Sequence, residues 1–288
     1  MRELRLVLGD QLNLNHHWFD AVDDTVTYLL VESVNELSYV PHHWQKAAAF
    51  LAAMRAFATE LKSRGHKVTY LRLNDSDNHG SLVETVQALL ETHDFDAFSY
   101  QRPDEYRLLT EFESFEFLVP TQCIDSDHFI LPFEEISSRF KAGAAHRMEA
   151  FYRFMRKRTG YLMEAGEPEG GRWNYDAENR KSIGASDDRP KLLLFSNDVE
   201  DIVQLLTATG LPFFGQKATQ LLWPIDRRQS LALLEAFCND LLPHFGDYQD
   251  AMSDQHDVDW SLYHSRLSFS LNSKMISPRE VIEAAIRT

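Results

Sequence analysis

Strand-like and helix-like segments alternate over the first 125 residues, and this alternation constrains the fold more than any other feature of the sequence. The first two strand-like segments are short apolar runs, which is typical of buried parallel strands. The segments between them place apolar residues three or four positions apart, as amphipathic helices do. This order predicts an α/β fold with a five-stranded parallel sheet and helices on both faces. The expected strands are Glu3 to Asp10, Thr25 to Glu32, Lys67 to Leu73, Asp96 to Gln101 and Thr121 to Asp125.

The helices between these strands have recognisable ends. One helix stops at Gly65, and Ser81 is expected to cap the next. Pro103 opens a third, in which the apolar spacing predicts that Tyr106 and Phe112 face inward.

Ligands of parallel sheets bind beyond the carboxyl ends of the strands. Two polar segments are placed there, namely Gly9-Asp10-Gln11-Leu12 and Glu32 to Tyr39. Gly9 lets the backbone approach a ligand, while Glu36 offers a carboxylate acceptor and Tyr39 an aromatic wall. Neither segment carries a GxGxxG or GxxxxGK[ST] pattern, so we do not expect a conventional dinucleotide or phosphate site.

A stretch rich in glycine and proline, Gly160 to Pro190, separates this α/β part from a part that is almost wholly helical. Its composition interrupts any helical or strand period. Connections of this length are uncommon inside a compact domain and are usually functional or disordered. Trp173 and Arg180 within it indicate that it is partly ordered. The helices expected beyond it are 198–210, 226–243 and 262–286.

The net charge of −15 excludes broad attraction to nucleic acid, because nonspecific binding comes from clustered Lys and Arg. One local basic run remains, on the segment that leads into the long loop. Two interpretations of it stay open, a contact to phosphates or a solvated helix face. The run consists of Arg147, Arg153, Arg156, Lys157 and Arg158.

Other features of the sequence point to no metal centre and no membrane. The two cysteines, Cys123 and Cys238, are expected to be buried thiols. Adjacent histidines such as His16 and His17 would point apart on a helix and rarely share one ion. No run reaches the ~18 apolar residues of a membrane span, and the N-terminus lacks the layout of a signal peptide. We therefore expect a cytoplasmic location.

Ser265, Arg266 and Ser268 cluster near the start of a later apolar segment. Hydroxyls beside the free amides of a helix start can form an anion site suited to a diphosphate. A simple helix cap is the more common reason for serine at a helix start.

Together these segments resemble the photolyase/cryptochrome family. More narrowly, they resemble the deoxyribodipyrimidine photolyase-related group, with its iron–sulfur bacterial cryptochromes and prokaryotic (6-4) photolyases. The most specific match is EPEGGRWNYDAENR, Glu167 to Arg180, in the loop. The other matching stretches are Leu6 to Leu12, Val31 to His43, Met148 to Met163, Phe245 to Met252 and His264 to Pro278.

The resemblance implies a light-dependent flavoprotein with a Rossmann-like antenna domain. In the family, light-excited reduced FAD passes an electron to a (6-4) lesion flipped out of DNA, so the expected partner is DNA containing UV photoproducts. A lumazine, 6,7-dimethyl-8-ribityllumazine, serves as the antenna. By matching position, Gly9, Asp10, Glu36 and Tyr39 would line its pocket, in agreement with the pocket expected from the sheet.

The resemblance also implies two further sets of residues. The set around the FAD phosphates and ribityl chain is Tyr248, Ser265, Leu267 and Ser268. The DNA-facing set is Arg180 with Arg153, Arg156 and Arg158.

Relatives of this kind have a longer helical domain, which carries the rest of the flavin pocket and four cysteines for a [4Fe–4S] cluster. We therefore expect an N-terminal fragment with an antenna domain (1–135), a connecting helix and interdomain loop (136–195) and an incomplete all-α FAD-binding domain (196–288). Such a chain should bind FAD poorly, hold no cluster or catalytic residue, and not repair DNA. It could still bind the antenna. Its unpartnered helices predict self-association, or poor order after about Asp254.

Three other interpretations stay open. The longer protein of which this chain would be a fragment could be a blue-light photoreceptor cryptochrome, which shares the scaffold. The chain could also be a nonenzymatic chromophore-binding or nucleotide-binding module. An α/β hydrolase or transferase would need a nucleophile, and no GxSxG elbow is present.

Overall fold

The computed structural model describes residues 1–183, 189–255 and 259–288, and the chain divides into two compact units. The first unit comprises Met1–His128, Leu194–Leu231 and Leu267–Ser277. The second comprises Phe129–Leu193, Ala232–Arg266 and Pro278–Thr288. The domain boundaries expected at residues 135 and 195 stay a prediction.

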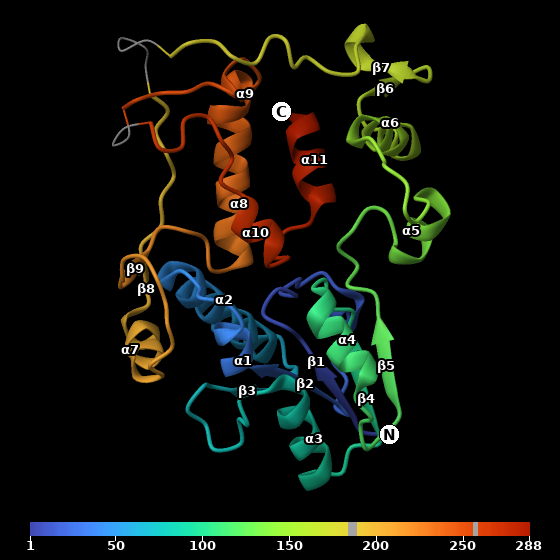
Figure 1. Cartoon of the computed structure of the whole chain (residues 1–288), viewed down its shortest axis with the longest axis vertical. Coiled ribbons are helices and arrows are strands. Elements are labelled where there is room, and N and C mark those ends of the chain that lie inside the picture. Colours follow the sequence, from blue (N-terminus) through green and yellow to red (C-terminus); the bar gives the residue numbers. More distant parts are fainter. Residues whose placement is uncertain (184–188, 256–258) are drawn as a thin grey trace. The chain divides into compact units, whose positions relative to one another are not determined.

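A five-stranded, all-parallel sheet forms the centre of the first unit (Figure 1). The strand order is β3-β2-β1-β4-β5, and this confirms the predicted α/β fold. Leu6 at the end of β1 pairs with Leu29 of β2 on one side and with Tyr100 of β4 on the other. The carboxyl ends of these three strands therefore lie side by side. The strands are β1 Glu3–Leu6, β2 Val26–Val31, β3 Lys67–Leu71, β4 Ala97–Gln101 and β5 Thr121–Ile124.

Alternating strand residues build a hydrophobic core on each face of this sheet. On β2, Tyr28 and Leu30 belong to one core while Leu29 and Val31 belong to the other, as the two-residue period of a strand requires. The first core packs against α2 and α7, and the second against α3 and α4. Helices thus cover both faces, as predicted. The helices of this unit are α1 Val34–Ser38, α2 Trp44–Ser63, α3 Leu82–Thr92, α4 Tyr106–Ser114, α7 Glu200–Ala208 and α10 Ser268–Asn272, with a 3-10 turn at His17–Phe19.

Local details differ from the sequence-based expectations in three places. Tyr106 is 80% exposed, so its predicted inward orientation is wrong; as the first residue of α4 it lies before the helix turns its apolar stripe inward. Ser81 occupies the N-cap position of α3, but its side chain forms no capping hydrogen bond. Cys123 is exposed rather than buried, whereas Cys238 is buried; both are free thiols.

The second unit is mainly helical. The sequence predicted a loop after α6 with no regular secondary structure. The structure differs, because β6 Met163–Glu164 and β7 Glu167–Pro168 pair as a short antiparallel hairpin. Gly160 ends α6 with φ of 75°, a left-handed conformation that favours glycine. Residues 184–188 of the predicted loop lie outside the described residues. The elements of this unit are α5 Phe133–Arg139, α6 Met148–Thr159, a 3-10 turn at Glu169–Gly171, a π-helix at Phe237–Leu241, α9 Leu242–Tyr248 and α11 Pro278–Arg287.

Two of the expected helices are divided in the structure. The range 226–243 contains α8 Arg227–Ala236, the π-helix and the start of α9. The range 262–286 contains two helices, α10 and α11, with Pro278 at the start of the second. A small antiparallel pair, β8 Asn197–Asp198 and β9 Gln220–Leu221, precedes and follows α7. Within the described ranges, no helix combines the length and the apolar character that crossing a membrane requires.

Candidate ligand pocket at the strand ends

A cavity of about 220 Å³ lies at the carboxyl ends of the strands in the first unit. Residues that follow β1, β2 and β4 line it, together with one side of α2. Between β1 and β4 the strand order reverses, and such switch points are where open α/β sheets bind ligands. The lining is apolar on the helix side and rich in carboxylates on the loop side. The ionisable side chains of the lining are Asp10, Glu32, Glu36, Tyr39, His42, Lys46, Asp104 and Glu105.

The four residues predicted for the antenna pocket all line this one cavity. Gly9 and Asp10 follow β1, and Glu36 and Tyr39 belong to the short helix α1 and its C-cap. Sequence reasoning thus brought together residues that the structure also brings together. Their contact with a chromophore stays a prediction.

Gly9 allows the backbone to pass close to α2. A β-carbon added to Gly9 would lie 3.0 Å from Sδ of Met54 and 3.9 Å from the Phe50 ring. Both side chains line the cavity. Any larger residue at position 9 would therefore displace Met54, and the cavity would lose volume.

Arg107 does not line the cavity, but it contacts an acidic residue and an aromatic residue of the cavity wall, Glu36 and Tyr39. Its Nη2 donates to both carboxylate oxygens of Glu36, at 2.9 and 2.8 Å, and its guanidinium lies 4.6 Å from the centre of the Tyr39 ring. Glu105 also pairs with Nη2, at 2.9 Å. Burial raises the pKa of Glu36, and Arg107 opposes that rise.

The loops after β1 and β4 meet at a buried lysine. Nζ of Lys274, whose side chain is 1% exposed, donates to the main-chain oxygen of Asp10 at 2.8 Å and to Oδ2 of Asp104 at 2.6 Å. The Asp10 carboxylate lies 3.6 Å from the same nitrogen. Burial and the neighbouring Asp104 raise the pKa of Asp10, while Lys274 lowers it.

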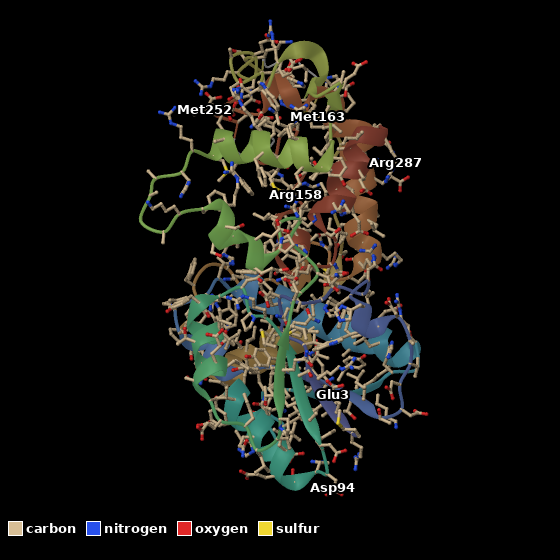
Figure 2. All side chains as sticks on the ribbon, turned by 90° about the vertical axis from the view of Figure 1, so that its right-hand side faces the viewer. Glu3, Asp94, Arg158, Met163, Met252 and Arg287 are labelled. Carbon is tan, nitrogen blue, oxygen red and sulfur yellow. The ribbon has the colours of Figure 1, made fainter. Side chains whose placement is uncertain are left out.

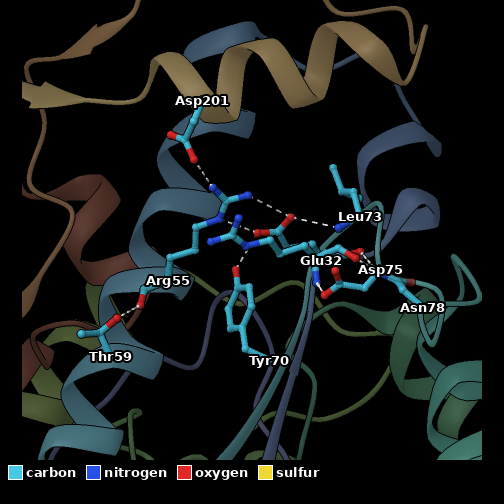
Figure 3. A network of polar contacts seen from close by, with 9 residues as sticks. Glu32, Arg55, Thr59, Tyr70, Leu73, Asp75, Asn78 and Asp201 are labelled. Carbon is cyan, nitrogen blue, oxygen red and sulfur yellow. Dashed lines mark hydrogen bonds and ion pairs between the residues drawn. The ribbon is translucent and has the colours of Figure 1, made fainter.

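Glu32 fixes the end of β2 through a buried polar network (Figure 3). Its carboxylate accepts hydrogen bonds from Nε of Arg55 at 2.7 Å, the Tyr70 hydroxyl at 2.8 Å and the Leu73 amide at 3.1 Å. Arg55 also donates to Asp201 of α7 at 2.8 Å. Because the side chain of Glu32 is completely buried, these donors replace the water that an ionised carboxylate would otherwise need.

Gln11, which the sequence placed among possible ligand contacts, serves the protein instead. Its amide nitrogen donates to the main-chain oxygens of Gln101 and Arg102, and its amide oxygen accepts from the Leu8 amide. This fully buried side chain therefore joins the loop after β1 to the loop after β4.

Sequence reasoning missed Arg107, Lys274, Arg55 and Asp104, and it placed Glu32 in the polar segment after the second strand without predicting its buried network. Arg107 and Arg55 lie on helix faces whose apolar spacing gives no sign of their partners. Lys274 acts on loops more than 160 positions away, since its partner Asp104 is separated from it by 170 positions in sequence. Only Glu32 carried a usable signal, a charged residue directly after an apolar strand.

The residues predicted to contact FAD belong to both units. Tyr248, at the end of α9, stacks on Tyr263 with ring centres 5.0 Å apart and planes at 18°; both belong to the second unit. Ser265 also belongs to the second unit, whereas Leu267 is buried in the first and Ser268 begins α10 there. Their joint contact with a flavin stays a prediction.

The predicted DNA-facing arginines differ in their surroundings. Arg156 is buried, donates to the Tyr152 hydroxyl at 3.0 Å and also bonds the main-chain oxygens of residues 161 and 162. Arg158, labelled on α6 in Figure 2, pairs with Glu135. The other two are more exposed. Arg153 pairs with Glu149 and lies 5.1 Å from the Trp173 ring, and Arg180 is 3.5 Å from an Asp250 oxygen.

His16 and His17 lie closer together than the sequence predicted. Their ring centres are 4.2 Å apart, because His16 is an extended N-cap residue rather than part of a helix. Asp127 bonds His17 Nδ1 at 2.5 Å. His16 accepts from the Trp18 amide through Nδ1 and so donates from Nε2 to the Asp125 oxygen at 3.0 Å. Both ring nitrogens of His16 therefore serve the protein.

The sheet and the cavity define a class, a parallel α/β protein with a ligand pocket at its strand ends. Comparison with known proteins gives the family. The model of a family described as deoxyribodipyrimidine photo-lyase-related protein matches residues 5–222. The chain therefore belongs to the deoxyribodipyrimidine photolyase-related family, as its motifs suggested.

A curated relative agrees with this assignment. The chain is 36% identical, over 295 aligned residues, to a (6-4) photolyase of Agrobacterium fabrum (strain C58). The alignment covers 100% of this chain and 57% of that protein. The chain thus spans a little more than half the length of the relative.

Proposed function

We propose that the first unit is the antenna-binding part of a photolyase and that its cavity holds 6,7-dimethyl-8-ribityllumazine. One observation supports this most. Gly9, Asp10, Glu36 and Tyr39, which match the antenna positions of the family, line a single cavity at the switch point of the sheet. The bound chromophore would supply light absorption.

The chemistry of the lining fits such a ligand. Carboxylates of Asp10, Glu36 and Glu105 can accept hydrogen bonds from ribityl hydroxyls and ring N–H groups. Phe50 and Met54 offer an apolar wall to a flat ring. The cavity is smaller than the roughly 300–1,000 Å³ typical of ligand sites. Binding of the whole chromophore would therefore move Tyr39, which is 48% exposed, away from the opening.

The same lining opposes a phosphorylated ligand. Four carboxylates, those of Asp10, Glu36, Asp104 and Glu105, line its loop side. The lining contains one lysine, Lys46, against these four carboxylates. Lys274, which is buried beside the cavity, is already engaged by two aspartates. We therefore propose a chromophore without a phosphate.

We further propose that the protein to which this sequence belongs repairs (6-4) photoproducts in DNA with FAD as the catalytic cofactor. The relationship to a (6-4) photolyase supports this proposal. FAD, when bound, supplies the electron for repair. Tyr248, Ser265, Leu267 and Ser268 are the residues proposed to contact it.

A binding titration with three ligands tests the antenna proposal. Lumazine, FMN and ADP are added in turn to the purified 288-residue chain, and ligand fluorescence anisotropy or, for ADP, heat of binding is measured. We expect lumazine to bind, FMN to bind at least tenfold more weakly, and the Glu36→Ala variant to lose lumazine. A preference for ADP would instead favour a nucleotide-binding module, and an unchanged affinity of Glu36→Ala would remove the pocket from the proposal.

A further inference from the structure

A lysine from near the end of the sequence, Lys274, bonds two residues that line the cavity. Residues 267–277 belong to the first unit, although more than 30 positions separate them in sequence from Leu231, the end of the preceding segment of that unit. The main-chain oxygen of Ser273 accepts from the Leu12 amide at 2.9 Å, and Met275 joins the core that α2 covers. These contacts fix the chain on either side of Lys274.

Lys274 itself is held in a demanding position. Its φ is 60°, a left-handed conformation that is uncommon for a residue with a β-carbon. Its side chain is among the largest that are fully buried in the described part of the chain. A buried ammonium group is costly unless it is paired and hydrogen-bonded. Asp10 and Asp104 supply the partners, so position 274 is built for a cation.

The partners, rather than Lys274, reach the cavity. Asp10 and Asp104 both line it, whereas Lys274 does not. Their carboxylates are 34% and 30% exposed, in contrast to the 1% of the lysine. The lysine therefore touches no ligand but sets the place and charge of two groups that could.

We infer that Lys274 is a positioning residue of the pocket, which holds the loops after β1 and β4 together and keeps the side chains of Asp10 and Asp104 in place. The inference deepens the proposed antenna function and rests on it where a ligand is concerned. Its effect on the ligand-free chain stands independently. Without the lysine, two carboxylates would face each other at the strand ends with no cation between them.

Protonation of Asp10 would relieve the repulsion between the two carboxylates in a chain without Lys274. The pH dependence of stability therefore tests the role of the lysine. Asp10 faces Asp104 and Lys274, which come from the loop after β4 and from the segment after α10. The pKa of Asp10 is already raised by burial, and removing Lys274 would raise it further. An acid whose pKa is higher in the folded state destabilises the fold as pH rises. The other ionisable groups of the cavity are Glu32, Glu36, Tyr39, His42, Lys46 and Glu105.

The test compares Lys274→Met, Lys274→Met/Asp10→Asn and the wild-type 288-residue chain. Lys62→Met removes an exposed lysine of α2 and serves as the matched control. Urea unfolding is measured without ligand from pH 5 to pH 8, and the dissociation constant of lumazine is measured at pH 8.

At pH 8 we expect Lys274→Met to raise the unfolding equilibrium constant by more than about 100-fold, in line with the cost of breaking a buried ion pair. The effect should shrink towards pH 5. The double variant should lose most of this pH dependence, because no like-charged pair remains. Where the wild type binds lumazine, Lys274→Met should raise the dissociation constant at least tenfold and Lys62→Met should not.

The outcomes separate this inference from the antenna function. If the wild type does not bind lumazine, the antenna proposal fails while the ligand-free pH profiles still decide the role of Lys274. A loss of stability that is equal at pH 5 and pH 8 would overturn the inference, and so would unchanged lumazine binding in Lys274→Met. If Lys274→Met does not fold at pH 8, a folded state at pH 5 supports the inference, and failure of the double variant to fold at both pH values overturns it.

Discussion

One nitrogen of Arg107 bonds both carboxylate oxygens of Glu36, at 2.9 and 2.8 Å. This ion pair fixes the position of the Glu36 carboxylate in the cavity wall. Burial raises the pKa of Glu36, and Glu105 and Glu111 raise it further, whereas the hydrogen bonds and charge of Arg107 lower it.

Replacing Arg107 by leucine should therefore weaken ligand binding through Glu36. The pKa of Glu36 rises in the variant, so lumazine affinity is lost at a higher pH on acidification than in the wild type. We expect at least a fivefold weaker affinity at pH 6, measured by anisotropy, and a smaller difference at pH 8. Arg64→Leu, at an exposed ion pair on α2, is the control. Identical pH profiles for Arg107→Leu and wild type would contradict this.

Gly9→Ala should narrow the cavity with little loss of stability. The added β-carbon meets Sδ of Met54 at 3.0 Å, and this flexible side chain can shift by a few tenths of an ångström into the cavity. Lumazine binding should weaken, while the free energy of unfolding changes by less than about 1.5 kcal/mol. Gly246→Ala adds a β-carbon where nothing lies within 4 Å and should leave binding unchanged. Stronger binding by Gly9→Ala would rule out a steric role.

Glu32→Ala should destabilise the first unit severely. It leaves Arg55 and the Tyr70 hydroxyl without their buried acceptor, and removing one partner of a buried ion pair costs about 3–5 kcal/mol. Urea unfolding measures the loss. Glu84→Gln on an exposed position of α3 provides the comparison, and a cost below 1 kcal/mol for Glu32→Ala, of the order of a surface pair, would be incompatible with the network.

DNA binding, if it involves the predicted arginines, should depend on the exposed ones. Arg153 and Arg180 are free to reach phosphates by exchanging one ion-pair partner, whereas Arg156 is buried. Replacing both by glutamine should make the slope of log K against log salt shallower by about one unit per lost phosphate contact. The same slope in wild type and double variant would favour the other interpretation of the basic run, in which its arginines lie on a solvated helix face.

Self-association stays a prediction that the surface of the second unit makes testable. Met148 of α6 and Ile286 of α11 are 76% and 42% exposed, and α11 has no buried residue. We expect light scattering to show oligomers that Met148→Glu and Ile286→Glu reduce. These substitutions lie on exposed positions and should not unfold the chain. A monomeric wild type would exclude this prediction.

The sheet was predictable because strand-like and helix-like segments alternate along the chain, and the structure confirms all five strands. The alternation, rather than an apolar run, predicted β5, whose sequence is TQCI. The same topology predicted that the segments after the first two strands, which contain Gly9 and Tyr39, line the cavity. The contacts that support these segments were not predictable. Arg107, Lys274 and Asp201 reach their partners across long sequence separations, and no period or motif encodes such contacts. The start of the second helix in the 262–286 segment was predictable, because Ser277-Pro278 is typical of a helix start, and α11 begins at Pro278.

The first unit is discontinuous in sequence, and this affects how the protein can be dissected. Residues 1–135 alone would lack α7, which covers part of the core on α2, and would also lack Lys274. Excision, domain exchange or fusion of the first unit would therefore have to carry three separate chain segments together.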